Sequence, residues 1–224
     1  MVPSSGYLKN FIIRPYSPGM LLQYPRSETK GEIPEFKDAP MFGKALKASH
    51  NWAKLTNLDS VAHINHYIEN GHIVELINIA EAKHYQMLSE LGQRILEDSE
   101  DIRLICIAGP SSSGKTTFAN RLRIELMSRG LNAIRLSIDD YYLPRELAPR
   151  DEYGNYDLES IYALDIELFN KNMLDLINGE EVELPKFDFK KGQRVPGRKL
   201  KVAANQPIII EGIHSASKCF ICGW

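Results

Sequence analysis

Eight consecutive residues carry the most specific chemistry in the chain. They read Gly109-Pro110-Ser111-Ser112-Ser113-Gly114-Lys115-Thr116 and match the phosphate-binding loop pattern, in which four residues separate a glycine from Gly-Lys-Ser/Thr. Backbone N–H groups between such glycines converge on phosphate oxygens, while the lysine adds positive charge and the hydroxyl can ligate Mg²⁺. The pattern therefore predicts a nucleotide-phosphate site made by Gly109, Ser111, Ser112, Ser113, Gly114, Lys115, Thr116 and Thr117.

Acidic residues that follow two later apolar runs are the second candidate group. Asp139 and Asp140 come directly after residues 132–138, and Glu211 lies at the end of residues 206–212. Open α/β sheets place their ligands at the carboxyl ends of such strands. An acid there can act as a base, bind the water shell of Mg²⁺, or cap a helix, and the neighbouring phosphate loop favours catalysis. Glu211 is placed like the second acidic motif of phosphate-loop enzymes.

The elements that must position these residues can be read from the same stretch. Residues 102–108 are a short apolar run typical of a buried parallel strand, and residues 117–129 have apolar side chains at helical spacing before Gly130. Residues 132–138 and 206–212 predict further strands, and residues 165–178 predict a helix that ends at Gly179. A strand, a glycine loop and a helix in this order are the setting that the phosphate loop requires.

The first 98 residues differ in character from the rest. They open with a stretch predicted to be loop-like, because it is rich in turn formers: Pro15, Pro18, Gly19, Pro25, Gly31, Pro34 and Pro40. Helices are predicted at residues 45–52, 60–70 and 73–97, and a polar run then leads into the first strand. We therefore expect an accessory region of α-rich or α+β type at 1–98 and a nucleotide-binding domain at 99–224.

Composition sets broad limits on location and partners. The chain has 224 residues, 43% of them hydrophobic, and a formal net charge of −2, which gives no overall attraction to nucleic acid or anionic membranes. No apolar run approaches the roughly twenty residues that span a bilayer. The N-terminal residues lack the pattern of a secretory signal, and the three cysteines (Cys106, Cys219 and Cys222) do not suggest a disulfide framework. A cytoplasmic protein with no membrane partner is expected.

Five ordered blocks resemble the uridine kinase/phosphoribulokinase family. They are residues 109–117, Asp139-Asp140-Tyr141-Tyr142, Tyr156-Asp157, Pro185-Lys186-Phe187-Asp188-Phe189 and Ile210-Glu211-Gly212. The resemblance covers roughly residues 100 to 214. It implies a three-layer α/β P-loop fold with a mainly parallel sheet, and phosphoryl transfer from ATP, with Mg²⁺, to a hydroxyl of a nucleoside-like or sugar-like acceptor.

The resemblance also assigns roles to individual residues. It implies that Asp139 accepts the proton of the acceptor hydroxyl, and that Lys115 and Mg²⁺ neutralise the phosphates. Asp157 matches a position that holds ribose hydroxyls, and Phe187 matches an aromatic beside the base pocket. Tyr142, in the same block as Asp139, is placed with them on the substrate side. Thr116 and Glu211 are the residues expected at the metal.

The chain departs from the family pattern in two places. Residues 190–194 lack the histidine that helps read pyrimidines in uridine–cytidine kinases, and this basic run reads as a solvated hairpin or, less commonly, as a contact for an anionic acceptor. Family members continue into an arginine-bearing lid, whereas this sequence stops at Trp224. We therefore expect a truncated chain whose sheet is incomplete on its C-terminal side, with apolar surface that favours association into homo-oligomers. An incidental tail is favoured over half of a zinc site for Cys219 and Cys222.

Residues 1–98 form an addition to a minimal uridine kinase. Residues 11–16, 19–25 and 80–84 resemble a bacterial group of nucleoside kinase-like proteins whose front region is similar to the accessory and editing domains of threonyl-tRNA synthetase. His63 and His66 are read as ordinary surface histidines rather than metal ligands. Packing of a loop is favoured over RNA contact for the cluster of Arg14, Tyr16, Tyr24 and Arg26. The alternative function is a nucleotide-binding regulatory module without turnover, linked to RNA or translation.

Overall fold

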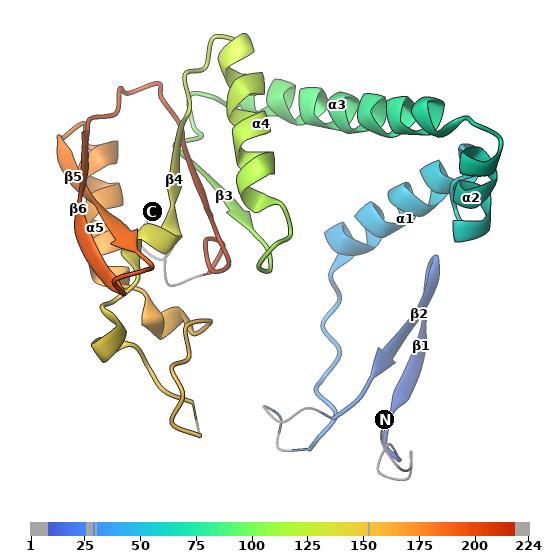
Figure 1. The fold of residues 1–224 in the computed structure, drawn as a ribbon, viewed down its shortest axis with the longest axis horizontal. Helices are drawn as coiled ribbons and strands as arrows, with labels where there is room; N and C mark the ends of the chain where they lie inside the picture. The colour runs from blue at the N-terminus through green and yellow to red at the C-terminus, as the bar shows by residue number, and fades with distance from the viewer. Residues whose placement is uncertain (1–8, 26–28, 30, 152, 218–224) are drawn as a thin grey trace. The chain divides into compact units, whose positions relative to one another are not determined.

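The computed structural model describes residues 9–25, 29, 31–151 and 153–217 (Figure 1). The chain divides into two compact units, residues 1–80 and residues 81–224. This division falls inside a long helix, α3 (Ile73–Glu97), whereas the sequence suggested a domain boundary at residue 98. The physical reason is that Leu88 and Ile95, in the second half of α3, are buried in a hydrophobic cluster of the second unit.

The first unit contains a β-hairpin that the sequence reading missed. Strand β1 (Ile12–Tyr16) pairs antiparallel with β2 (Gly19–Gln23), so the prediction of a loop-like stretch is wrong for these residues. The turn formers Pro18 and Gly19 lie at the turn between two short runs of strand-forming residues. A hairpin needs turn formers between its two strands, and in the sequence these residues were interpreted as a loop without strands.

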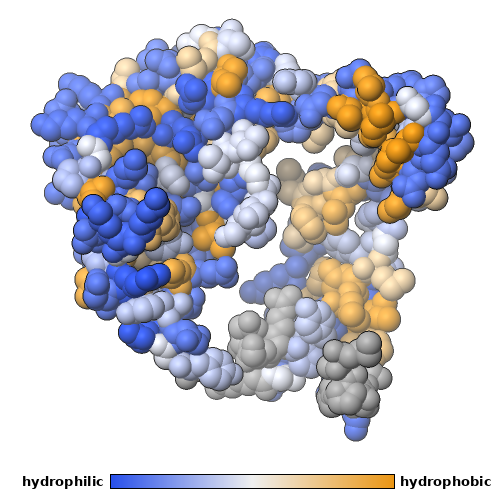
Figure 2. Space-filling model, in the orientation of Figure 1, coloured by the Kyte–Doolittle hydropathy of each residue, from blue (hydrophilic) through white to orange (hydrophobic). Residues whose placement is uncertain are grey.

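Two helices follow the hairpin, and α3 begins in this unit. Helix α1 (Pro40–Leu55) is longer than the predicted 45–52 because Pro40 is tolerated in a first helical turn. Helix α2 (Val61–Glu69) begins after Ser60, whose hydroxyl accepts a hydrogen bond from the His63 N–H. No residue of α1 or α2 is buried. Figure 2 shows apolar side chains gathered on the surface of this unit, and Met20, Met41 and Leu55 are among the most exposed.

A three-stranded parallel sheet forms the centre of the second unit. Its order is β3 (Leu104–Ala108), β7 (Ile208–Gly212) and β4 (Ile134–Ser137), so β7 lies in the middle although it is last in the chain. All three strands occur where the sequence predicted them. The register pairs Ile107 with Glu211 and Ser137 with Glu211, so the carboxyl ends of the strands meet at one edge of the sheet.

Helices cover both faces of this sheet and give it three layers. On one face, Ile209 packs in a cluster with buried residues of α3 and of α4 (Lys115–Ser128). On the other face, Ile208 and Ile210 pack with buried residues of α5 (Ile166–Ile177). Side chains alternate along a strand, so β7 is buried on both sides, as a central strand must be. The predicted α/β class is confirmed.

A second hairpin and short 3₁₀ segments complete the unit. Strands β5 (Val182–Asp188) and β6 (Gln193–Leu200) pair antiparallel, and their turn contains the basic run that the sequence placed in a hairpin. The 3₁₀ segments are η1 (Ile138–Tyr141), η2 (Arg145–Leu147) and η3 (Ile161–Ala163). Within the described residues, no helix is both long enough and apolar enough to cross a bilayer.

Candidate functional site

The phosphate loop lies between β3 and α4, as its pattern requires. Gly114 precedes α4 with φ of +85°, and Ser112 also has a positive φ of 58°. These left-handed conformations turn the backbone sharply, and the glycine adopts its conformation without steric cost. At the other end of the loop, a Cβ on Gly109 would lie 2.9 Å from the Ser113 hydroxyl oxygen. The two ends of the loop thus favour glycine for different reasons, a positive φ at Gly114 and a close side-chain neighbour at Gly109.

Lys115 is folded back over this loop. Its Nζ atom donates a hydrogen bond to the Pro110 carbonyl oxygen at 2.7 Å. That bond holds the ammonium group at the loop, beside the position where the backbone N–H groups would bind phosphate oxygens. A phosphate oxygen can replace the carbonyl as the partner of the ammonium group.

Glu211 joins three elements at the carboxyl edge of the sheet. It is a buried carboxylate, 4% exposed, on the central strand β7. Its Oε1 atom accepts hydrogen bonds from the Thr116 hydroxyl at 3.2 Å and from the Arg135 guanidinium at 3.3 Å. Arg135 is a site residue that sequence reasoning missed, because its partner is known only once β4 and β7 are known to be neighbours.

The pair of Thr116 and Glu211 has the donor atoms that suit Mg²⁺. Both are hard oxygen ligands, and their oxygens lie within 3.2 Å of each other. The described residues contain no cluster of three or more His, Cys, Asp or Glu side chains arranged for a metal. Magnesium fits here nevertheless, because it commonly takes one or two protein ligands and completes its shell with phosphate oxygens and water.

Asp139 lies on η1, immediately after β4, and is half-buried. Burial raises the pKa of its carboxyl group, and the negative charge of Glu211 raises it further, while the charges of Lys115 and His214 oppose the shift. The pKa of Asp139 is therefore influenced by the charges of both Glu211 and Lys115. A carboxylate with a raised pKa binds a proton more strongly, which suits a general base.

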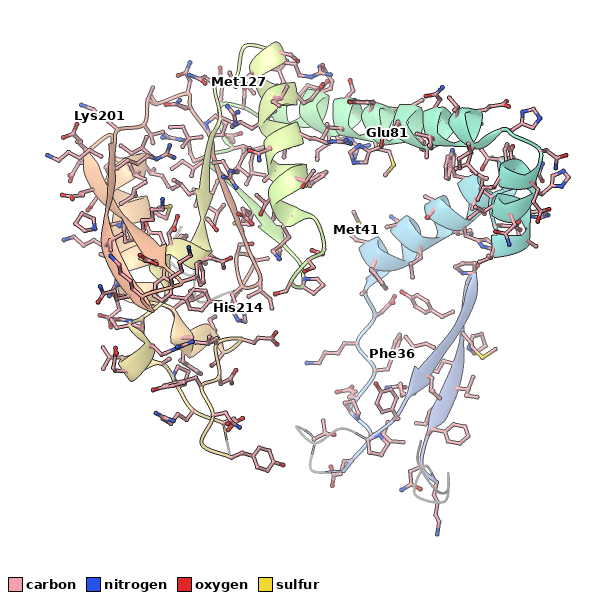
Figure 3. All side chains as sticks on the ribbon, in the orientation of Figure 1. Phe36, Met41, Glu81, Met127, Lys201 and His214 are labelled. Atoms are coloured by element: carbon pink, nitrogen blue, oxygen red, sulfur yellow. The ribbon has the colours of Figure 1, made fainter. Side chains whose placement is uncertain are left out.

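Gly212 lets η1 approach the end of β7. A Cβ at this position would overlap the Ile138 side chain and would lie 3.7 Å from the Asp139 Oδ1 atom. His214, labelled in Figure 3, follows the same strand. Its Nε2 atom lies 2.6 Å from the Glu159 carbonyl oxygen. The residues after β7 thus help to hold Asp139 and residues 149–160 at the same edge of the sheet.

Asp140 has a different role from its neighbour. Its Oδ1 atom accepts a hydrogen bond from the Phe187 N–H at 3.3 Å, which ties η1 to β5. The sequence could not distinguish these two adjacent carboxylates. The structure uses Asp140 to anchor the hairpin and leaves Asp139 as the candidate base.

Three aromatic side chains form a group next to Asp139. The Tyr142 ring centroid lies 5.7 Å from that of Phe187 and 6.1 Å from that of Phe189, and the two phenylalanines are 4.9 Å apart. Burial raises the pKa of Tyr142, with a further contribution from the charge of Asp139. Phe189 was quoted in the family block but was not assigned to the site. The group offers an aromatic surface to an acceptor.

Asp157 lies in a segment that is tied to this aromatic group. Its Oδ1 atom accepts a hydrogen bond from the Ser160 N–H at 3.1 Å, and its own N–H donates to the Pro149 carbonyl. The next residue, Leu158, accepts a hydrogen bond from the Tyr142 hydroxyl at 3.0 Å. Asp157 is therefore near the aromatic group through its backbone, while part of its carboxylate caps a local turn.

Other candidates from the sequence have local structural partners. Arg194, at the end of the basic run, is paired with Asp165 at 2.8 Å, and Asp165 also caps α5. His63 is bonded to Asp59, and the Tyr16 hydroxyl donates to Asp38. In the cluster for which loop packing was favoured over RNA contact, Arg14 also donates a hydrogen bond to Gln23 at 2.7 Å, while Arg26 lies outside the described residues. Cys219 and Cys222 also lie outside them.

A separate cleft of about 840 Å³ runs along the outer edge of β4. Its lining contains no residue of the phosphate loop, so it is not the phosphate site. A phosphate loop is a shallow nest of backbone N–H groups at the surface, so it need not coincide with a large cleft.

Comparison with known proteins agrees with this geometry. The model of the phosphoribulokinase / uridine kinase family matches residues 104–219, which is more than half of the chain. The chain is 36% identical over 119 residues to a uridine kinase of Schizosaccharomyces pombe, and 34% identical over 126 residues to inorganic pyrophosphatase TTM2 of Arabidopsis thaliana. These alignments cover 51% and 56% of this chain but only 25% and 17% of the relatives, so the chain spans a quarter or less of their length.

A solved structure shows the same fold. It is described as a possible uridine kinase from Bacillus stearothermophilus, and it superposes with a TM-score of 0.52 at 25% identity. The superposition covers 62% of this chain and 76% of that one. The parallel sheet with helices on both faces is therefore an arrangement that this solved structure also has.

Proposed function

The chain belongs to the phosphoribulokinase/uridine kinase family, and on this premise we propose that it transfers the γ-phosphoryl group of ATP to a hydroxyl of a nucleoside or sugar acceptor. The observation that carries the proposal is the meeting of three strand ends. The phosphate loop follows β3, Glu211 lies next to the last residue of β7, and Asp139 follows β4, so all three lie at one edge of a sheet whose order is β3-β7-β4. Ligands of open parallel sheets bind at that edge.

The residues divide the reaction between them. The Asp139 carboxylate accepts the proton of the acceptor hydroxyl as the acceptor oxygen forms its bond to the γ-phosphorus. The bond between that phosphorus and the β–γ bridging oxygen breaks, and ADP leaves with the electron pair. Lys115 and the N–H groups of the loop stabilise the negative charge on the phosphate oxygens. Thr116 and Glu211 would hold Mg²⁺, which supplies further charge neutralisation when it is bound.

The acceptor side supports a nucleoside more than a bare sugar. Tyr142, Phe187 and Phe189 provide aromatic surface on which a base can stack, and Asp157 offers a carboxylate for hydroxyl groups. The relative named uridine kinase is consistent with this assignment. The resemblance of residues 1–98 to a synthetase accessory region stays a prediction, since the family model begins at residue 104.

ADP release from ATP and Mg²⁺ across a panel of nucleosides and sugars tests the proposal. We expect release that depends on one acceptor, with transfer of phosphate to that acceptor confirmed by mass spectrometry. The Lys115→Ala chain is the negative control. Slow ATP hydrolysis that no acceptor accelerates would contradict the kinase assignment and would favour a nucleotide-binding regulatory module.

A further inference from the structure

The cleft beside β4 is enclosed by three elements of the second unit. Helix α4 contributes Asn120 and Arg123, the edge strand contributes Arg135, and the β5–β6 hairpin contributes Lys186 and Arg198. The Arg198 guanidinium donates a hydrogen bond across the cleft to the Arg135 carbonyl oxygen at 3.3 Å. The hairpin is therefore linked to the open edge of the sheet. The volume of the cleft, about 840 Å³, is in the range of small-molecule sites.

The lining is strongly basic. Four cationic residues, Arg123, Arg135, Lys186 and Arg198, line the cleft together with a single acidic residue, Asp140. Arg135 is paired with Glu211, whereas no ion pair joins any of the other three to a carboxylate within the described part of the chain. The whole chain has a net charge of −2, so this is a local concentration of positive charge that composition does not explain. A surplus of positive charge around one cleft favours binding of an anion.

The polar groups of the lining favour phosphate as the anion. The arginine side chains present several N–H donors in a planar fork, which fits phosphate oxygens in a bidentate manner. Three amide side chains, from Asn120, Asn132 and Gln206, add further N–H donors. A group with many oxygens and more than one negative charge can use these donors together.

The lining offers no stacking surface for a base. Among the described residues that line the cleft, Tyr141 is the single aromatic, and it is only 2% exposed. Nucleotides and single-stranded RNA usually bind with bases stacked on accessible aromatic side chains. A compact anion without a base fits better.

We propose that this cleft binds a compact polyphosphate, either an inorganic chain or a sugar bisphosphate, at a site separate from the phosphate loop. Its lining contains none of the phosphate-loop residues and none of Asp139, Tyr142, Asp157 and Phe187. The two sites meet at Arg135, which lines the cleft and also pairs with Glu211. This inference does not depend on the kinase activity.

Calorimetric titration in buffer without Mg²⁺ tests the proposal on the Lys115→Ala chain, in which the phosphate loop is weakened. The probes are inorganic tripolyphosphate and fructose 1,6-bisphosphate. The probe that binds with the lower Kd shows whether the cleft prefers an inorganic chain or a sugar bisphosphate. We expect one binding site per chain. The added double variant Arg123→Gln/Arg198→Gln should weaken this binding by about tenfold or more, because two charge-assisted donors are lost.

The matched control is Lys199→Gln/Lys201→Gln, which removes the same charge from exposed positions on and next to β6 that do not line the cleft. The control should bind both probes as the Lys115→Ala chain does, and circular dichroism should show equal folding of the two double variants. Binding of neither probe to the Lys115→Ala chain would overturn the proposal. Equal weakening in both double variants would also overturn it, since the attraction would then be a general effect of charge.

Discussion

The phosphate side and the acceptor side of the candidate site are built in different ways. One continuous segment between β3 and α4 forms the phosphate side, and it works largely through its backbone, with Gly109 and Gly114 setting its shape. The acceptor side comes from three separate segments: η1, residues 149–160 and the β5–β6 hairpin. It works through side chains, held together by the bond from Phe187 to Asp140 and the bond from Tyr142 to Leu158.

This difference has a consequence for how each side responds to substitution. A phosphate nest made of N–H groups tolerates changes elsewhere in the chain, whereas an acceptor surface made of side chains from several segments can be altered one residue at a time. Changes to the two sides should therefore separate ATP binding from acceptor binding.

The largest effect is expected for Lys115→Ala. This change removes the ammonium group that the Pro110 carbonyl holds at the loop. We expect thermal stabilisation of the chain by Mg–ATP to be lost and phosphoryl transfer to fall by about a thousandfold or more. Differential scanning fluorimetry with and without Mg–ATP measures the first effect. Unchanged ATP affinity in the variant would show that the phosphates bind elsewhere.

A smaller effect, confined to the acceptor side, is expected for Phe187→Ala. The change removes an aromatic ring that packs on Tyr142 and Phe189. We expect the KM for the acceptor to rise by roughly two- to tenfold, which corresponds to one lost aromatic contact, while the affinity for ATP stays the same. Steady-state kinetics with each substrate varied in turn makes the measurement. An equal loss of ATP affinity would mean that the two sides are not separable.

The pH dependence of turnover should reflect the environment of Asp139. Burial and the charge of Glu211 raise the pKa of this carboxyl group. A base works in its ionised form, so kcat/KM should fall as the pH drops through this raised pKa, at a higher pH than an ordinary aspartate would give. The profile should be recorded beside that of the Asp140→Asn chain, whose acidic limb should remain but move to a slightly lower pH, because the charge of Asp140 also raises the pKa of Asp139.

The smallest effect is expected on stability. A carboxyl group whose pKa is raised by folding costs free energy when it is ionised, and that cost is present above the folded pKa and vanishes below the unfolded value. Asp139→Asn should therefore unfold at a slightly higher urea concentration than the unaltered chain at pH 7. The difference should disappear near pH 3. A variant that is less stable at pH 7 would indicate that the carboxylate makes favourable contacts in the folded state.

Several parts of this fold could be predicted from local patterns. The bounds of α3 follow from its apolar periodicity, and the strand, loop and helix around Gly114 follow from the glycine pattern and its flanking apolar runs. These features depend on residues close together in the sequence. The same reasoning placed β7 correctly, because a run of three isoleucines between polar segments is typical of a buried strand.

Other parts could not be predicted because they depend on which segments become neighbours. The pairing of Arg135 with Glu211 requires β7 to lie beside β4, which the chain order does not reveal. The different roles of Asp139 and Asp140 depend on the position of the β5–β6 hairpin. The β1–β2 hairpin was missed because its turn residues dominated a short segment.

Asp139, and not the adjacent Asp140, is the proposed base at the edge of the sheet. Single-turnover transfer of phosphate from ATP to the acceptor found in the panel should be compared for Asp139→Asn and Asp140→Asn, with ATP binding measured for both. The account predicts a loss of about a hundredfold or more in the rate for Asp139→Asn with ATP affinity unchanged, and a much smaller loss for Asp140→Asn. Normal turnover by the Asp139→Asn chain would contradict the account.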